Sequence, residues 1–452
     1  MESLTYLQLL RSNHSFRRLW LGQVVSELGN WFNFIAGLGL VRLVSNGDAT
    51  ATTIIVLARL VPFTVFAPLA GAFVDRWSRR TVMIVSDIAR VVLALGYLFV
   101  HTKDDLWIAY LCSVLLSVLT VFFEAAKNAT VPNITGDRDL LAGTALMWSS
   151  RFLLMSFGAA LGGWTAATVG YRAAFLVNAL SFLVSAWSIW LIPDSETRQP
   201  APLPVEGAPV GLEQTRPSYW TDIREGWSYI ISHRPVATIL VTNILWASGG
   251  GAINLVSDRL GGLVFAGEGG ISGDAAVAAL YFAAGLGLFI GMMIARRVGH
   301  YFERADRIPG FIGWSLILQG LLFAAIGVMP GLWLACLFLF LGRILLGAEF
   351  AVQETLLMRL VPDNLRGRVS TTDRAAELFI WSIATAAAGW SLRAITPQTL
   401  TVITGLLSAT AGIFWLLMFA TGQVRLPRRL RGKAGEAAVE AEMRASSSGG
   451  AV

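Results

Sequence analysis

Long apolar runs alternate with short polar breaks over most of the chain. Each run is long enough to cross the hydrocarbon core of a bilayer, which takes roughly 20 helical residues. Because a backbone in lipid must form its hydrogen bonds within its own segment, the runs are expected to be helices and not open strands. They lie near residues 18–44, 52–74, 81–101, 105–128, 141–168, 172–192, 236–258, 275–298, 309–329, 331–358, 370–394 and 399–421. The pattern therefore predicts twelve transmembrane helices.

The longest polar break divides these helices into six and six. It covers residues 193–235 and is rich in proline, which is typical of a flexible linker. We expect bundles of six helices at 18–192 and 236–421 on either side of it. Residues 1–17 are expected to form a cytoplasmic or interfacial segment, and residues 422–452 a disordered basic tail.

The two predicted bundles carry related features in the same order. Glu124 stands shortly before the sequence VPN, and Glu354 shortly before VPD, while Cys112 and Cys336 are separated by a similar distance along the chain. Transporters built from parallel repeats show this kind of internal similarity. The sequence thus predicts an all-α membrane protein with two pseudo-symmetric bundles of six helices.

Composition and charge agree with a membrane location. Only 14% of the 452 residues are charged and the mean hydropathy is +0.62, whereas soluble domains carry roughly 25% charged residues. With a cytoplasmic N-terminus, most of the 35 Lys and Arg residues fall in cytoplasmic segments, as membrane proteins prefer. This distribution explains the net charge of +6 without nucleic acid as a partner. The exceptions are Lys103, Arg172, Arg259 and Arg393 in external loops, and Arg42, Arg59, Arg90, Arg151 and Arg343 within the runs.

Sequence motifs of several enzyme classes are absent from the chain. It contains no GxxxxGK[ST] phosphate loop, no HExxH metal motif and no G-x-S-x-G nucleophile motif. Both cysteines lie in apolar runs and read as buried apolar side chains. We therefore expect neither an enzyme nor a metal or other cofactor.

One loop motif links the chain to a known family. The sequence GAFVDRWSRR at 71–80, between the second and third predicted helices, resembles the G-x-x-x-D-R-x-x-R-R signature of the major facilitator superfamily. The phrases at 16–32 (FRRLWLGQVVSELGNWF), 122–134 (FFEAAKNATVPNI) and 361–370 (VPDNLRGRVS) resemble its bacterial efflux branch, which includes macrolide and enterobactin exporters. The resemblance implies a secondary transporter whose two bundles rock around a central cavity.

The resemblance also implies a latch that holds the cytoplasmic side shut. Gly71 would permit close approach of the second and eighth helices, and Asp75 would face the start of the eleventh. Asp87 and Arg90, one turn apart, would support the latch structurally. Simple enrichment of basic residues in cytoplasmic loops is the alternative explanation. The predicted latch consists of Gly71, Asp75, Arg76, Arg79, Arg80, Asp87 and Arg90.

Polar and ionisable residues within the runs are candidates for proton or substrate binding, because each is costly in hydrocarbon. Glu27 and Asn30 share a face of the first helix, and Glu27 is a candidate proton acceptor or a structural hydrogen-bonding group. Glu124 and Glu354 are expected to act as gate residues, with Lys127, Arg151 or Arg359 as ion-pair partners. The candidates are Glu27, Asn30, Trp31, Asn33, Glu124, Arg151, Glu349, Gln353, Glu354 and Glu377. Charge balance within the bundle is the structural alternative for these residues.

Together these features predict proton-coupled export of a small amphiphilic molecule, such as a drug, a macrolide or a siderophore. The expected protein is a monomer in the plasma (inner) membrane, with the lipid bilayer around it and both termini in the cytoplasm. Two alternatives remain open. One is a lipid or lysophospholipid transporter on the same fold, and the other is a membrane sensor without transport activity.

Overall fold

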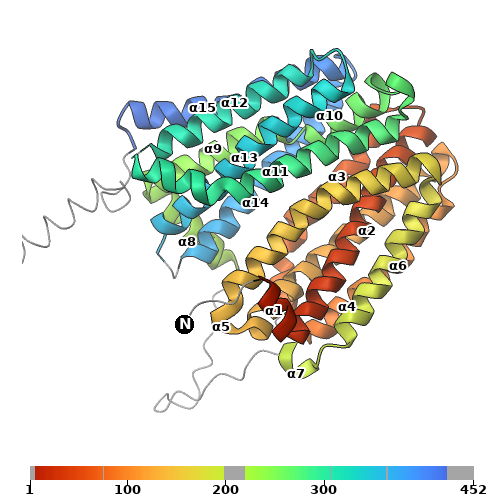
Figure 1. Ribbon diagram of the computed structural model, residues 1–452, viewed down its shortest axis with the longest axis horizontal. Coiled ribbons are helices and arrows are strands. Elements are labelled where there is room, and N and C mark those ends of the chain that lie inside the picture. Colours follow the sequence, from red (N-terminus) through yellow and green to blue (C-terminus); the bar gives the residue numbers. More distant parts are fainter. Residues whose placement is uncertain (1–5, 75, 198–218, 306, 363–364, 425–452) are drawn as a thin grey trace, which may run out of the picture. The chain divides into compact units, whose positions relative to one another are not determined.

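Helices account for the regular structure of the described chain. The computed structural model describes residues 6–74, 76–197, 219–305, 307–362 and 365–424, and these residues contain no strand. The helices, labelled in Figure 1, are α1 (Tyr6–Ser12), α2 (His14–Val44), α3 (Ala49–Val74), α4 (Arg79–Gly96), α5 (Leu106–Thr168), α6 (Tyr171–Trp190), α7 (Asp194–Thr197), α8 (Tyr219–Ser232), α9 (Arg234–Gly250), α10 (Ile253–Arg259), α11 (Gly273–Arg304), α12 (Ile308–Ile326), α13 (Leu332–Leu360), α14 (Arg366–Ser391) and α15 (Pro397–Ala420).

The predicted spans are helical in the structure. Ten described helices are long and apolar enough to cross a membrane. The two other predicted spans are residues 141–168, within α5, and residues 370–394, most of which belong to α14. The predicted helix near 236–258 is interrupted, because α9 ends at Gly250 and α10 begins at Ile253. The all-α architecture with twelve spanning segments is thus confirmed.

The break expected between the two spans of α5 lies at Gly136. Residues 129–135 and 137–140 are helical, and the path turns at Gly136, whose φ of 66° and ψ of 170° suit glycine almost alone. Pro132 lies within the helix just before this turn. Helix α5 therefore consists of two helical limbs that meet at Gly136.

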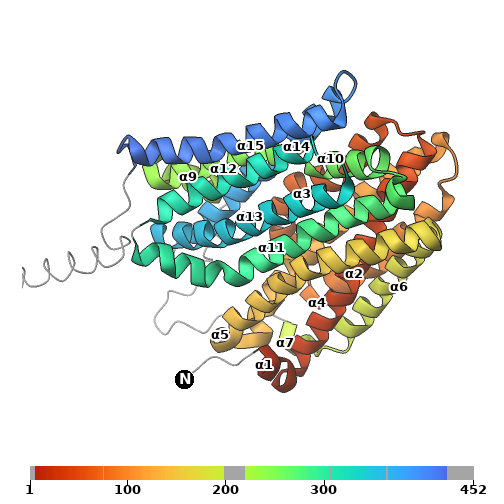
Figure 2. The same ribbon diagram turned by 45° about the horizontal axis from the view of Figure 1, so that its top comes forward.

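The chain forms two compact units, each described by itself. The first comprises Met1–Thr221, Ile253–Gly285 and Thr385–Pro397, and the second comprises Asp222–Ala252, Leu286–Ala384 and Gln398–Val452. In the first, α2 packs against both α5 and α6, which run beside it in Figures 1 and 2. In the second, α12 packs against α13. Each unit has its own apolar core.

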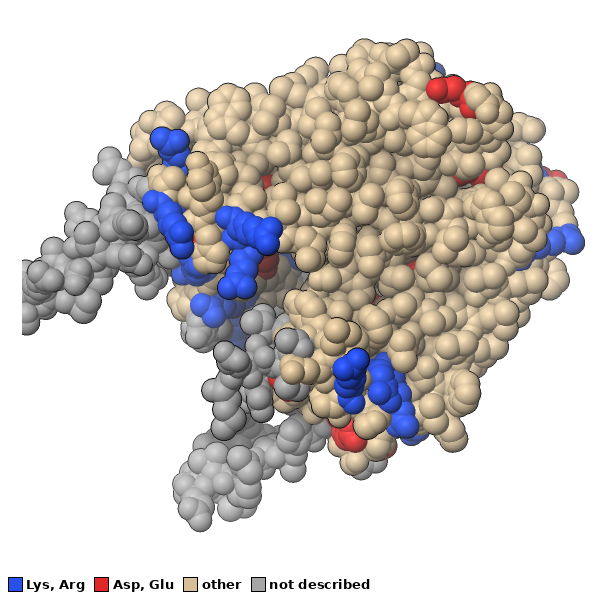
Figure 3. All heavy atoms as spheres, viewed as in Figure 1, with Lys and Arg blue, Asp and Glu red and all other residues tan. Residues whose placement is uncertain are grey.

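Helix α6 shows why these helices suit lipid. Leu176, Leu180 and Trp187 form an exposed apolar stripe at helical spacing, while the opposite face buries Asn178 and Ser185. A helix in water would carry the polar groups outside and the apolar groups inside. The helical surfaces visible in Figure 3 are mostly uncharged, and Lys and Arg side chains gather near helix ends. Lipid is the solvent that this surface fits.

Candidate functional site

A small cavity in the first unit is lined by α2 and by both limbs of α5. Its volume is about 210 Å³. Helix α2 contributes one face of the lining, and the turn at Gly136 brings the second limb of α5 back beside the first. The lining residues are Trp20, Gln23, Val24, Glu27, Glu124, Lys127, Asn128, Val131, Pro132, Leu140, Thr144, Met147, Trp148, Ser150, Arg151 and Leu154.

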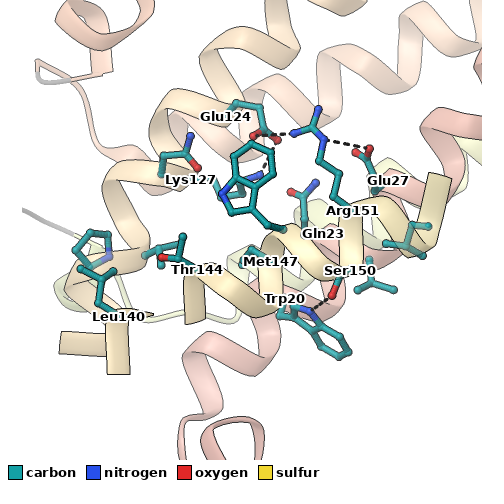
Figure 4. A pocket seen from close by; sticks show the side chains of 16 residues that line it. Trp20, Gln23, Glu27, Glu124, Lys127, Leu140, Thr144, Met147, Ser150 and Arg151 are labelled. Atoms are coloured by element: carbon teal, nitrogen blue, oxygen red, sulfur yellow. Dashed lines mark hydrogen bonds and ion pairs between the residues drawn. The ribbon is translucent and has the colours of Figure 1, made fainter. Parts of the chain in front are cut away.

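Four ionisable side chains meet at this cavity, and we call them the cavity charge cluster: Glu27, Glu124, Lys127 and Arg151. Arg151 lies between the two carboxylates (Figure 4), with Nε 3.9 Å from Glu27 Oε1 and Nη1 3.7 Å from Glu124 Oε2. Lys127 Nζ donates to Glu124 Oε1 at 2.6 Å. The two acids and two bases compensate one another, which limits the cost of enclosing four charges.

The pairs within the cluster are unequal in a way that matters for ligand binding. The Lys127 side chain is 8% exposed and holds Glu124 at hydrogen-bond distance, whereas that of Arg151 is 42% exposed and reaches both carboxylates at long range. The Arg151 guanidinium also lies 5.8 Å from the Trp148 ring centroid. Arg151 and Glu27 are therefore the members of the cluster that a ligand can most easily recruit.

The rest of the lining mixes apolar and polar groups. Met147, Trp148 and Leu154 supply apolar surface. Trp20 donates its indole N–H to Ser150 Oγ at 2.9 Å, which links α2 to the second limb of α5. Gln23 Oε1 is buried and has no hydrogen-bond partner within the part of the chain that the structure describes. The cavity thus offers charge, a spare acceptor and apolar contact to one small ligand.

Three further candidates on α2 lie outside the cavity lining. Asn30 donates to Glu27 Oε2 at 3.5 Å, so the predicted shared face is confirmed. Trp31 packs edge-on against Phe34, with ring centroids 5.6 Å apart, and belongs to the periphery of the apolar core. Asn33 is buried. These three residues are therefore not among those that line this cavity.

The candidates in the second unit form separate groups. Gln353 of α13 donates to Asn243 of α9, and Asn243 donates to Asp373 of α14, each at 2.9 Å. Glu377 pairs with Arg374 at 2.7 Å along α14.

Two glutamates on α13 remain from the candidate set. Glu349 is 2% exposed and Glu354 is half-buried. Arg359, which was expected as an ion-pair partner of a gate glutamate, pairs with Glu303 at 2.5 Å. Glu124, in contrast, pairs with Lys127 and Arg151 as expected.

The structure describes six of the seven residues of the predicted latch. Asp75 lies outside the described residues, and Arg76 is exposed. A Cβ placed on Gly71 would meet no described atom within 4 Å. Arg79 donates to the Ala129 carbonyl at 2.6 Å, and Arg80 donates to that of Trp190.

The remaining latch residues form an internal pair within the first unit. Asp87 and Arg90 form an ion pair on α4, and the Arg90 guanidinium lies 4.3 Å and 4.6 Å from the ring centroids of Phe123 and Phe182. This pair therefore links α4 to α5 and α6, as a structural support would.

One charged group was not recognised from the sequence. Arg42 donates to Asp258 and Asp274 near helix ends of the first unit. Arg42 stood out as a charge within an apolar run, but nothing in the linear pattern pointed to its two partners. Acidic residues in or beside other apolar runs are the signal that could have identified these partners.

Long apolar helices and a small charged cavity within the bundle define a multi-pass membrane transport protein. The sequence model described as Major Facilitator Superfamily matches residues 19–372, and the chain belongs to this family. Members of the family bind small-molecule substrates and typically work as monomers. The family consists of transporters and not of enzymes.

Curated relatives match parts of the chain. An uncharacterized MFS-type transporter YfiS of Bacillus subtilis is 24% identical over 225 residues, which cover 49% of this chain and 50% of the relative. Macrolide efflux protein A of Streptococcus pyogenes is 26% identical over 129 residues, or 28% of this chain and 31% of the relative. The chain thus matches half of the first relative and about a third of the second, and the likeness to the second agrees with the bacterial efflux branch.

Solved structures share the fold over most of the chain. The nucleoside transporter NupG has a TM-score of 0.66 at 13% identity, covering 90% of this chain and 99% of that one. A bacterial homolog of the human lysosomal transporter Spinster has a TM-score of 0.67 at 15% identity, covering 90% and 97%. At these identities the likeness concerns the fold alone.

Proposed function

We propose that this transporter exports a small amphiphilic molecule, such as a drug, a macrolide or a siderophore, in exchange for protons. Export proceeds by alternating access across the plasma membrane, with six-helix bundles at 18–192 and 236–421 that move against each other. Both termini lie in the cytoplasm, because that orientation places most basic residues on the cytoplasmic side. The similarity to macrolide efflux protein A supports an efflux role.

The observation that carries the proposal is the charged cavity between α2 and α5. A ligand with an acidic group would draw Arg151 away from its two distant carboxylates, whereas a basic group would compete with Arg151 for Glu27. Apolar parts of the same ligand would contact Trp148 and Met147. These contacts suit a molecule with both a charged and an apolar portion.

Proton coupling is assigned first to Glu27. Its carboxylate is held by Arg151 at 3.9 Å and by Asn30 at 3.5 Å, so a proton on Glu27 would release Arg151 to Glu124 and to substrate. Glu349 and Glu377 in the second unit are the other candidates. Each proton that moves inward gains about 2.3 kcal/mol per 100 mV of membrane potential, which can drive export against a gradient.

The charged lining of the cavity distinguishes the proposed export from lipid transport. A lipid or lysophospholipid transporter needs a long apolar wall for acyl chains, whereas this cavity is lined by two carboxylates and two cations. Enclosing an acyl chain beside those charges would strip them of water without replacing it. The charge cluster therefore favours an amphiphile with a charged group over a lipid.

Inside-out membrane vesicles test the proposal with a macrolide as the probe. A macrolide added to energised vesicles should release protons from the lumen, read by a pH-sensitive dye, and radiolabelled macrolide should accumulate inside. Glu27→Gln should abolish both signals, while Glu196→Gln, the same change at an exposed position on α7, should leave both intact. Unaltered proton release by the Glu27 variant would remove that residue from coupling. A fluorescent lysolipid translocated in place of the macrolide would support the lipid alternative.

A further inference from the structure

A buried ion network lies at the ends of five helices in the first unit. Arg42, in the last turn of α2, donates to Asp258 near the end of α10 and to Asp274 at the start of α11. The exposed fractions of the three side chains are 9%, 0% and 12%. Such burial identifies a built contact, because surface pairs keep their hydration and contribute little.

Two more side chains extend the network. Arg259 is 2% exposed and donates to the carbonyls of Gly47 at 2.5 Å and Asp48 at 2.7 Å, and to Thr52 Oγ1 at 2.5 Å. Tyr171, at the start of α6, donates to Asp274 Oδ2 at 2.6 Å. The interactions therefore tie α2, α3 and α6, which precede the linker, to α10 and α11, which follow it.

Glycines make room for these contacts. A Cβ on Gly262 would collide with the Arg42 guanidinium, and a Cβ on Gly39 would collide with Asp274 and Tyr171. A Cβ on Gly273 would lie 2.7 Å from the Gly262 carbonyl oxygen. A larger residue at Gly39 or Gly262 would displace the charged groups, and one at Gly273 would displace the backbone at Gly262. The backbone is thus fitted closely around the ion network.

We propose that Arg42, Asp258 and Asp274 form a gate that closes the transporter on the side opposite the N-terminus. The inference rests on the alternating-access mechanism proposed above. To admit substrate or release it on that side, the helices before and after the linker must separate, which breaks both Arg42 pairs. Water then hydrates the freed charges and offsets much of the loss, so the closed and open arrangements are both accessible.

Removing the positive charge of Arg42 should favour the open arrangement. While the gate is closed, Asp274 would keep only its hydrogen bond from Tyr171, and Asp258 would keep only Arg259, whose Nε lies 3.8 Å from Asp258 Oδ2. Opening would return both carboxylates to water.

The test uses a single cysteine at Met147 in the cavity, with Cys112 and Cys336 changed to Ala. Labelling by a membrane-impermeant maleimide is measured from each face of the membrane, without substrate. Arg393→Gln is the matched control, since Arg393 is an exposed arginine in the first unit that donates to a threonine at 3.3 Å.

The Arg42→Gln variant should label about tenfold faster from the side opposite the N-terminus, which corresponds to about 1.4 kcal/mol. Its labelling from the other side should fall, and the Arg393 control should match the parent protein. If Arg42→Gln does not fold, Asp274→Asn should give the same shift in the same direction. Parental labelling rates from both sides in a folded variant would overturn the gate. Because the assay uses no substrate, that result would not bear on the proposal of macrolide export. A failure to export macrolide would likewise not contradict the gate.

Discussion

The ion pair between Asp87 and Arg90 offers a sharp test of how the first unit is held together. Asp87 is fully buried, Arg90 is 1% exposed, and the guanidinium is enclosed by the rings of Phe123 and Phe182. Asp87→Asn keeps the size and shape of the side chain and removes its charge. It therefore leaves Arg90 buried and charged without a counter-ion.

The expected loss is large because the enclosed arginine cannot reach water. Removing one partner of a buried ion pair typically costs about 3–5 kcal/mol. The two ring contacts of Arg90 persist, and each contributes about 0.5–2 kcal/mol at most, so they hold the guanidinium in place without replacing the carboxylate. We expect a net loss of about 3 kcal/mol. At about 2–4 °C per kcal/mol, the midpoint of thermal unfolding should fall by roughly 6–12 °C.

Thermal unfolding of the purified protein in detergent, followed by tryptophan fluorescence, measures this change. Asp104→Asn is the control, because it makes the same substitution at an exposed position. A double variant, Asp87→Asn with Arg90→Met, should recover much of the loss, since no buried charge then remains unpaired. An unchanged midpoint in the single variant, or a double variant that is less stable still, would refute the reasoning.

Two further predictions address the turn in α5 and the lipid-facing surface. Gly136→Ala forces a side chain into a backbone conformation nearly restricted to glycine, so it should cost about 1–3 kcal/mol and lower the unfolding midpoint; an unchanged midpoint would contradict the turn. Leu180→Lys places a charge on the exposed stripe of α6 and should cost about 2.5–3.5 kcal/mol of insertion free energy, visible as reduced membrane-inserted yield beside Leu180→Ala. Equal yields of the two Leu180 variants would show that this face does not meet lipid.

The helices could be predicted because lipid imposes a simple rule on each segment separately. Each predicted apolar run is helical over most of its length, including the more polar α14 and the run near 236–258, which is interrupted after Gly250. The break in α5 could be predicted because Pro132 and Gly136 usually mark the end of a helix, and the chain leaves the helical conformation at Gly136. Only the structure shows that the first helical limb extends up to Gly136 and that the second begins directly after it.

The candidate site was predictable as individual residues and not as an arrangement. Glu27, Glu124 and Arg151 stood out as charges in apolar runs, but their convergence depends on how α2 packs against both limbs of α5. Trp31, another candidate on α2, lies outside the lining of this cavity, and helix periodicity alone does not say which face meets a neighbouring helix. The partners of Arg42 were missed for the same reason, because long-range pairing is a property of tertiary packing.

Protection of the cavity from alkylation tests most directly whether this is where substrate binds. In vesicles that export a macrolide, a cysteine at Met147 should react more slowly with maleimide when macrolide is present. The protection should disappear in Glu27→Gln and persist in Glu196→Gln. Equal reaction rates with and without macrolide, in vesicles that still export it, would place the substrate elsewhere and contradict the assignment of this cavity.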